Sequence, residues 1–373
     1  MKPQRNVNAD ILRLIAAFFV PAVHFMLNNG FYYIPIAGAE MTVMVVMRSF
    51  FIVCVPLFLL LTGYLMKNKQ LSKSYYKGIV HTLVIYLLSS VLCGVYILLF
   101  VGGKTPLELA LGIFGFTTAP YGWYVEMYIG LFLLIPFLNL IYNNLPSDRA
   151  KRVLMGTLVL LTSLPAILNV YRFDTLEWWI VPSQNAAFQP LLPKFWAGLY
   201  PLTYYYIGAY LRDHEPRLKQ FQRIILIVSV VTVSSAYNLW RSVPGVFVWG
   251  AWNDWASPFN LALSVLVFGF VMRLPTERAP DKLRKALSFL SSLTLGAYLT
   301  SFIFDHFYYY LLQLKEPTVA GKLKYFPLIV PAVFLSAMIL SALLELPYRG
   351  VSALWRRRKT GKPGDTDPVP VQE

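Results

Sequence analysis

The sequence predicts an all-α, polytopic integral membrane bundle of about ten transmembrane helices, and three observations support this prediction. First, 57% of the 373 residues are hydrophobic and only 14% are charged, and the mean hydropathy is +0.55. This composition is typical of membrane proteins. Second, apolar runs long enough to span a bilayer recur along the chain as far as Leu346. Third, Lys and Arg residues concentrate in alternate loops between these runs.

Ten apolar runs are expected to form the membrane spans. A helix of roughly 20 apolar residues is enough to cross the hydrocarbon core. The approximate ranges of the runs are 9–30, 43–66, 78–102, 122–144, 151–171, 196–211, 224–240, 255–272, 286–312 and 325–348. We therefore expect one transmembrane domain over residues 1–350 and a basic, disordered tail over residues 351–373.

The distribution of positive charge orients these spans. Of the 33 Lys and Arg residues, 24 lie in six alternate segments, which are 1–8, 67–78, 145–152, 212–223, 273–285 and 349–363. Because positive residues in short loops prefer the cytoplasm, we expect these segments and both termini to be cytoplasmic. The net charge of +15 is then explained by topology and by attraction to anionic membrane lipid. Since this charge is divided among short loops, no nucleic-acid partner is expected.

The first apolar run carries two ionisable residues, Arg13 and His24. Eleven residues are close to three helical turns, so both side chains should lie on one face, about 16 Å apart along the axis. Charged or titratable groups are costly within a membrane, and they usually face a cavity and serve a function. Pro21 has no N–H to donate to the carbonyl of Ala17, so we expect a kink and a wider cavity just before His24.

Asp10 lies three residues before Arg13 and allows two interpretations. The pair can be a local i, i+3 ion pair, with Arg13 directed to the nearby interface. Alternatively, Arg13 binds an anionic group that enters from the cytoplasm, because a guanidinium forms paired hydrogen bonds with phosphate or a polarised carbonyl.

His24 is expected at the same depth as two further polar residues, Arg48 and Glu126. All three should lie about 7–9 Å below the outer boundary of the membrane. Together they could supply a general base, an anion stabiliser and an orienting carboxylate. An Arg48 to Glu126 ion pair that only holds helices together fits equally well. Trp123 and Tyr124 lie at interfacial depth, where aromatic belts are common, and stacking on a sugar is the alternative.

Several other chemistries have no signature in this sequence. Cys54 and Cys93 lie inside apolar runs and are expected to pack as small hydrophobic residues. The four histidines lack HExxH spacing, and there is no Gly-rich phosphate loop and no GxSxG motif. We therefore expect no metal site and no bound cofactor.

The arrangement of Asp10, Arg13, ten intervening residues and His24 resembles the first-span signature of the acyltransferase family 3 membrane proteins. Further similar stretches follow in the order of the family and extend the resemblance over nearly the whole chain. They are Val55-Pro56-Leu57-Phe58, Thr62-Gly63-Tyr64-Leu65, Trp123-Tyr124, Ile129-Gly130-Leu131-Phe132-Leu133-Leu134-Ile135-Pro136, Tyr205-Tyr206-Ile207-Gly208 and Ser292-Leu293-Thr294-Leu295-Gly296-Ala297-Tyr298-Leu299. Two positions depart from the family pattern: Thr62 replaces a serine, and Ser301 stands where a histidine often follows Tyr298.

The resemblance implies transfer of an acyl group, usually acetyl, from cytoplasmic acyl-CoA to a hydroxyl of a carbohydrate or glycolipid at the membrane. Such a protein resembles surface-polysaccharide and sugar O-acetyltransferases of a bacterial cell membrane. Acetyl-CoA would be the donor substrate, and glycan-assembly proteins would be partners.

The resemblance and the chemistry of the residues together assign roles. His24 would act as a general base or form an acyl-histidine intermediate. Arg48 would stabilise an oxyanion or an acceptor phosphate, and Glu126 would orient His24 or pair with Arg48. The remaining assignments are Arg13 and Asp10 for the donor and Trp123 and Tyr124 for the acceptor.

A transporter or flippase of a glycolipid or small solute is the alternative, because it would also need many spans and intramembrane ionisable residues. No internal repeat of the kind found in many transporters is visible in the sequence. Release of CoA that depends on His24 would distinguish catalysis from transport.

Overall fold

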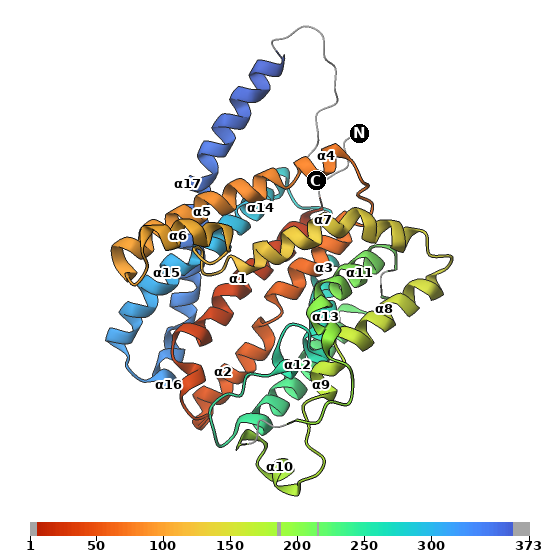
Figure 1. Cartoon of the computed structure of the whole chain (residues 1–373), viewed down its shortest axis with the longest axis vertical. Helices are drawn as coiled ribbons and strands as arrows, with labels where there is room; N and C mark the ends of the chain where they lie inside the picture. The colour runs from red at the N-terminus through yellow and green to blue at the C-terminus, as the bar shows by residue number, and fades with distance from the viewer. Residues whose placement is uncertain (1–5, 185–187, 215, 361–373) are drawn as a thin grey trace.

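The computed structural model describes residues 6–184, 188–214 and 216–360, with side chains described as far as Tyr348. Every regular element in these ranges is helical, and the one β-type contact among them is an isolated bridge between Pro35 and Val246. The predicted all-α fold class is confirmed. Figure 1 shows the helices gathered into one bundle, with the end of α17 extending away from it.

Within the described ranges the α-helices, in chain order, are α1 (Val7–Asn28), α2 (Gly38–Phe51), α3 (Cys54–Met66), α4 (Lys73–Lys77), α5 (Val80–Tyr96), α6 (Pro106–Phe114), α7 (Trp123–Asn143), α8 (Asp148–Thr162), α9 (Pro165–Leu168), α10 (Leu176–Ile180), α11 (Tyr200–Asp213), α12 (Gln220–Ser242), α13 (Pro258–Met272), α14 (Asp281–Ser292), α15 (Thr294–Lys315), α16 (Val319–Lys322) and α17 (Phe326–Thr360). Short segments labelled η, which include η2 (Ile97–Val101), η4 (Phe195–Leu199) and η5 (Ala251–Asn253), lie between or extend some of them.

One face of the bundle is formed by helix ends rich in basic residues, and we call it the basic face. Lys67, just after α3, forms an ion pair with Asp213 at the end of α11. Asn8, near the start of α1, donates to the carbonyls of Met272 and Leu274 at the end of α13. These polar groups lie at the ends of apolar segments, where the charge distribution of the sequence predicts them.

The middle of α17 reaches the same face. Ser341 donates to the carbonyl of Leu293, which lies between α14 and α15, and Glu345 pairs with His81 near the start of α5. The described chain therefore begins at the basic face, and α17 passes this face before it extends away from the bundle. The helix continues to Thr360, ten residues into the predicted tail 351–373, and residues 361–373 of that tail lie outside the described residues.

Nine of the ten predicted spans match segments that are long and apolar enough to cross a membrane. Eight are single segments, and the ninth is the pair α14 and α15, which bends by 57°. The predicted span near 196–211 is the exception: it forms η4 and the 14-residue α11, which is not among the segments long and apolar enough to cross a membrane. The expected number of ten long apolar spans is therefore one too high by this criterion.

The physical reason for the exception is that α11 lies inside the bundle and contacts protein on most sides. Its residues Tyr204, Tyr205 and Tyr206 are buried, and their hydroxyls donate to Trp255 O, Asn139 Oδ1 and Leu138 O. A helix surrounded by other helices can satisfy polar side chains internally and does not need the hydropathy of a lipid-facing span.

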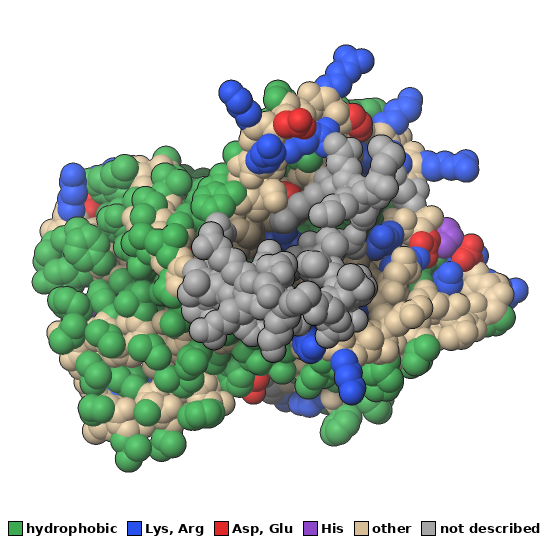
Figure 2. Space-filling model, turned by 90° about the horizontal axis from the view of Figure 1, so that it is seen from above, with side chains coloured by type: hydrophobic (Ala, Val, Ile, Leu, Met, Phe, Trp, Pro, Cys, Tyr) green, Lys and Arg blue, Asp and Glu red, His purple; other side chains and the backbone are tan. Residues whose placement is uncertain are grey.

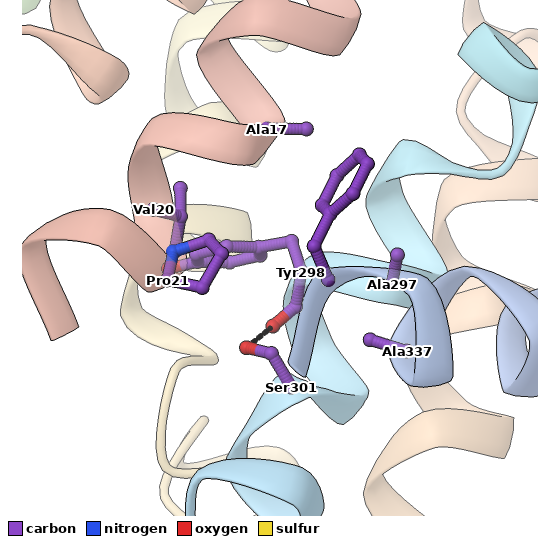
Figure 3. Close-up of a pocket in the computed structure, with 8 residues that line it drawn as sticks. Ala17, Val20, Pro21, Ala297, Tyr298, Ser301 and Ala337 are labelled. Carbon is purple, nitrogen blue, oxygen red and sulfur yellow. Dashed lines mark hydrogen bonds between the residues drawn. The ribbon is translucent and has the colours of Figure 1, made fainter. Parts of the chain in front are cut away.

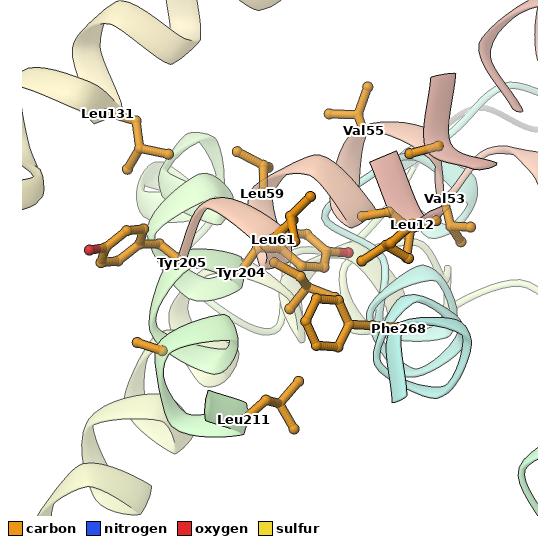
Figure 4. Packing of buried hydrophobic residues seen from close by; sticks show 14 of the residues in the cluster. Leu12, Val53, Val55, Leu59, Leu61, Leu131, Tyr204, Tyr205, Leu211 and Phe268 are labelled. Carbon is orange, nitrogen blue, oxygen red and sulfur yellow. The ribbon is translucent and has the colours of Figure 1, made fainter. Parts of the chain in front are cut away.

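The main core lies where α3 crosses α11 (Figure 4). A Cβ on Gly63 would overlap the backbone carbonyl of Tyr205, and a Cβ on Gly208 would overlap that of Leu60. Only glycine permits two helix backbones to approach so closely, and small residues commonly mark such contacts in membrane proteins. Side chains such as Leu59, Leu61 and Tyr204 pack around this crossing in Figure 4.

Exposed hydrophobic side chains lie on many of the described helices, among them α5, α6, α7, α8, α12, α15 and α17. Figure 2 shows hydrophobic side chains along a flank of the bundle, whereas Lys and Arg side chains gather around the helix ends seen from above. A bundle with an apolar flank and charged ends is what a lipid bilayer requires of a polytopic protein.

Candidate functional site

The site is built on a parallel contact between α1 and α15, which both start at the basic face. Near that face, the Ser291 hydroxyl donates to Asp10 Oδ1 over 2.6 Å. Deeper in the bundle, His24 Nδ1 lies 2.9 Å from Asp305 Oδ2. The first pair joins α1 to the end of α14 and the second joins α1 to α15, and in both pairs the residues are 281 positions apart in the chain.

The deeper cluster holds His24 between a carboxylate and a phenol. The Asp305 side chain is 2% exposed and that of His24 is 12% exposed. The Tyr121 hydroxyl donates to the same Asp305 Oδ2 over 2.7 Å, and its ring lies 4.1 Å from the His24 ring, centroid to centroid. A buried carboxylate that accepts Nδ1–H fixes the neutral tautomer in which Nε2 carries the lone pair.

His24 can therefore act as a base through Nε2. Among the described residues, Nε2 makes no hydrogen bond, whereas Nδ1 is held by Asp305. A histidine whose second nitrogen is oriented by a carboxylate is the arrangement used for proton transfer from a hydroxyl. Sequence reasoning missed Asp305, although it is the one acidic residue within the apolar run 286–312, and such a residue is itself a signal of function.

The second cluster, near the basic face, joins Arg13, Asp10 and Ser291. Arg13 Nη1 donates to Ser291 Oγ over 2.7 Å and lies 3.4 Å from Asp10 Oδ1. The local pair of Asp10 and Arg13 thus exists, but the shorter bond crosses to the bend between α14 and α15. The Arg13 side chain remains 27% exposed, so part of it is accessible to a ligand.

An aromatic ladder runs along α1 between the two clusters, from the start of α7. Tyr121 lies beside His24, while Tyr124 and Tyr128, one and two turns further on, are within electrostatic range of Arg13. Tyr298 of α15 contacts both Tyr121 and Tyr124, at centroid distances of 6.2 and 5.8 Å. Its buried hydroxyl has no hydrogen-bond partner within the described part of the chain.

A small pocket opens beside this ladder, at the level of Pro21 (Figure 3). It is lined by Ala17, Val20 and Pro21 of α1, by Ala297, Tyr298 and Ser301 of α15, and by Phe334 and Ala337 of α17. Ser301, which replaces the family's histidine, donates to the backbone carbonyl of Tyr298 over 2.8 Å. The pocket lies at the depth where the sequence predicts a wider space, between the levels of Arg13 and His24.

Arg48 is fully buried on the side of the bundle opposite the basic face. Its Nε donates to the Tyr32 hydroxyl, and Nη1 and Nη2 donate to the backbone and side-chain oxygens of Asn253. The rings of Phe247 and Trp249 lie 4.6 and 5.0 Å from its guanidinium carbon. In the described structure, no ion pair joins Arg48 to Glu126.

Glu126 is an exposed residue of α7, on the side of that helix near Tyr86 of α5. The structure thus places Asp305, and not Glu126, beside His24. Equal depth was the basis for grouping Glu126 with His24 and Arg48, but depth does not fix the direction in which a residue faces around the bundle.

Trp123 and Tyr124, at the start of α7, are partly buried and pack against other aromatic side chains. The Trp123 ring stacks on Trp255, with centroids 4.5 Å apart and an interplanar angle of 19°. Tyr124 packs near Phe58 and Tyr298. Among the described residues, no group of three His, Cys, Asp or Glu side chains is arranged to hold a metal ion.

Comparison with known proteins gives one match. A family model described as an acyltransferase domain matches residues 6–346, which is nearly the whole chain. No curated protein and no solved structure matches. The matched range contains both clusters, the aromatic ladder and, except for the last two residues of the final one, all the candidate spans found in the described residues.

Proposed function

The chain belongs to acyltransferase family 3, and on that basis we propose that it is an integral membrane O-acyltransferase that moves an acyl group, expected to be acetyl, from acyl-CoA to a hydroxyl of a carbohydrate or glycolipid. The apolar helices support a membrane location. We further propose that this is the cell membrane and that the basic face is cytoplasmic, since positive loops favour that side. The observation that carries the chemistry is the orientation of His24 by Asp305.

The proposed reaction uses His24 as a general base. The acceptor hydroxyl attacks the thioester carbonyl carbon while its proton passes to His24 Nε2. The C–S bond then breaks, and the departing CoA sulfur takes the proton back from Nε2, so the histidine is restored. Asp305 keeps Nδ1 protonated throughout and stabilises the imidazolium that forms.

The donor is proposed to enter from the basic face. Arg13, oriented by Ser291 and Asp10, would bind a phosphate or the polarised carbonyl of acyl-CoA. The extended pantetheine arm would then follow the aromatic ladder toward His24, a path of about 16 Å along α1. The unpaired hydroxyl of Tyr298 lies on this path and could bond a polar group of the arm.

The proposal gives different roles to three other residues, which are Arg48, Trp123 and Tyr124. Because all three nitrogens of Arg48 already donate to protein oxygens, we assign it to holding the acceptor side of the bundle in shape. Tyr124 is assigned to the donor path, and Trp123, stacked on Trp255, to its wall.

An acyl-histidine intermediate would use the same geometry. In that route Nε2 itself attacks the thioester carbon, CoA leaves, and the acceptor hydroxyl later takes the acyl group from the histidine. The two routes differ in one observable respect: the covalent route labels the protein when no acceptor is present.

The test is release of CoA from acetyl-CoA by the purified protein in lipid, with and without a membrane glycolipid extract. We expect release that needs the extract and that is lost in His24→Ala, with the acylated acceptor identified by its mass. Release without the extract, together with a labelled protein, would establish the acyl-histidine route.

A matched control comes from a second histidine. His81 pairs with Glu345 over 2.8 Å on the basic face, outside the proposed site. His81→Gln should therefore leave CoA release close to wild type. The proposal is overturned if neither acetyl-CoA nor another acyl-CoA gives any release, or if His24→Ala remains as active as wild type.

A further inference from the structure

A second buried arginine, on the side of the bundle opposite the basic face, has donors that the fold does not use. Arg241, in the last turn of α12, is 0% exposed. Its Nη1 donates to the carbonyl of Val170 over 2.9 Å. Its Nε and Nη2 are buried without a hydrogen-bond partner, and within the described ranges no carboxylate forms an ion pair with it.

Aromatic rings lie close to this guanidinium, and its Nε and Nη2 atoms are buried without a hydrogen-bond partner among the described residues. The Trp252 ring lies 3.9 Å from the guanidinium carbon and the Trp178 ring 4.8 Å from it. The indole Nε1 of Trp178 is also buried without a partner, and so is the hydroxyl of Thr175, three residues earlier. The unused groups around Arg241 are therefore mostly hydrogen-bond donors, and the site carries a positive charge.

Unused donors are not a general property of buried arginines on this side of the bundle, as Arg48 shows. Both arginines contact the same short turn, η5: Arg48 donates to Asn253, and Arg241 stacks on the preceding residue, Trp252. Arg48 uses all three of its nitrogens, whereas Arg241 uses one. A buried cation with unused donors is costly, and native proteins rarely keep one without a ligand or partner.

We propose that Arg241 binds an oxyanion, a phosphate or carboxylate group, of the acceptor molecule. Nε and Nη2 form the edge of a guanidinium that binds two oxygens of one anion side by side. Trp178 Nε1 adds a third donor from α10. That the bound anion belongs to an acyl acceptor rests on the proposed acyl transfer. The inference narrows this acceptor to an anionic glycoconjugate. Neutral sugars would lack the group that these donors require.

The binding test does not need the acyl donor. The purified full-length protein in lipid is titrated at constant ionic strength with inorganic phosphate, glucose 1-phosphate, glucuronate or glucose, and thermal unfolding is followed. We expect stabilisation by at least one of the three anions and none by glucose. Stabilisation by the sugar anions but not by free phosphate would assign the site to an anion carried on the acceptor, and stabilisation by free phosphate as well would show that the oxyanion alone is sufficient.

Two variants and a control locate the binding. Arg241→Gln should weaken anion binding about tenfold or more, since it removes the charge and the paired donors. Arg172→Gln, which removes an exposed arginine paired with Asp174 in the same region, should bind as wild type does. Equal binding by Arg241→Gln and wild type, or no stabilisation of wild type by any anion, overturns the proposal.

If Arg241→Gln does not fold, Trp178→Phe tests anion binding instead. This variant keeps an aromatic ring over the guanidinium and removes only the Nε1–H donor, so we expect anion binding about threefold weaker or more. Unchanged binding would mean that Arg241 only clamps the two tryptophans. Failure of acyl transfer with every acceptor would instead count against the proposed function, because anion binding is measured without acyl-CoA.

Discussion

His24 Nδ1 and Asp305 Oδ2 lie 2.9 Å apart between two parallel helices that are 281 residues apart in the chain. This contact leaves Nε2 as the reactive nitrogen of His24. Both side chains are nearly excluded from solvent, so the contact holds the ring in one tautomer and one orientation.

Replacement of Asp305 by Asn should therefore reduce the rate far more than it reduces donor binding. The amide can stabilise the wrong tautomer of His24, and we expect kcat to fall by about 10²–10⁴-fold while KM for acyl-CoA changes little. Steady-state CoA release measures both constants. Glu345→Gln, which alters the His81 pair, is the matched control, and a kcat for Asp305→Asn within threefold of wild type would contradict the assignment.

Tyr121→Phe should have a smaller effect. The variant removes the 2.7 Å hydrogen bond to Asp305 and keeps the ring beside His24. Because one neutral donor to a carboxylate is lost, we expect kcat to fall by roughly threefold to 30-fold. A loss as large as that of Asp305→Asn would show that the phenol itself takes part in proton transfer.

Arg13→Gln should act mainly on the donor. Removing the guanidinium removes a charged contact to acyl-CoA, so we expect KM for acyl-CoA to rise by about tenfold or more with a smaller change in kcat. Initial rates over a range of acyl-CoA concentrations measure this. Arg152→Gln, which removes an exposed arginine near the same face, controls for general charge, and an equal effect of both variants would argue against a donor site at Arg13.

Alanine at either crossing glycine should destabilise the protein. At Gly63 or Gly208 a Cβ would overlap the backbone of the other helix, so α3 and α11 would have to separate. We expect a loss of about 1–3 kcal/mol or more and a lower melting temperature in lipid or detergent. Gly130→Ala is the control, because nothing lies within 4 Å of a Cβ there and alanine favours a helix.

Glu316→Gln should change the acid sensitivity of the protein. Hydrogen bonds from Thr318 and Lys324 lower the pKa of Glu316 from 4.5 to about 2. A carboxylate with a lower pKa in the folded state stabilises it above pH 4.5, and that contribution disappears as the pH falls toward 2. Melting temperatures between pH 5 and about 2 should therefore fall less steeply in the variant. Identical slopes would show that these bonds do not affect folding.

The sequence predicted the class of fold and the common face of α1 that carries two residues of the candidate site. Hydropathy and charge located nine spans, and helical periodicity placed Arg13 and His24 on one face of α1, where the structure finds both against α15 or its preceding bend. The tenth run was harder, because α11 is rich in tyrosines that only neighbouring helices can satisfy.

The rest of the site depends on which helices are neighbours. Periodicity and topology give each residue a depth, but they do not state that α1 lies against α15, which is distant in the chain. Glu126 had the expected depth and faces elsewhere, whereas Asp305 faces His24. The proposed donor path could not be derived either, because the sequence does not state that Tyr124 packs beside Tyr298 of α15.

The stretch of α1 between the two clusters fixes the distance and the rotation between them, because it is one continuous helix. Removing one residue between Arg13 and His24 would turn the following part of the helix by about 100° and shorten it by about 1.5 Å. Asp10 could then still meet Ser291, but His24 would turn away from Asp305. A change of length within this stretch would therefore separate His24 from Asp305, whereas a change of length in a loop outside it would leave both contacts in place.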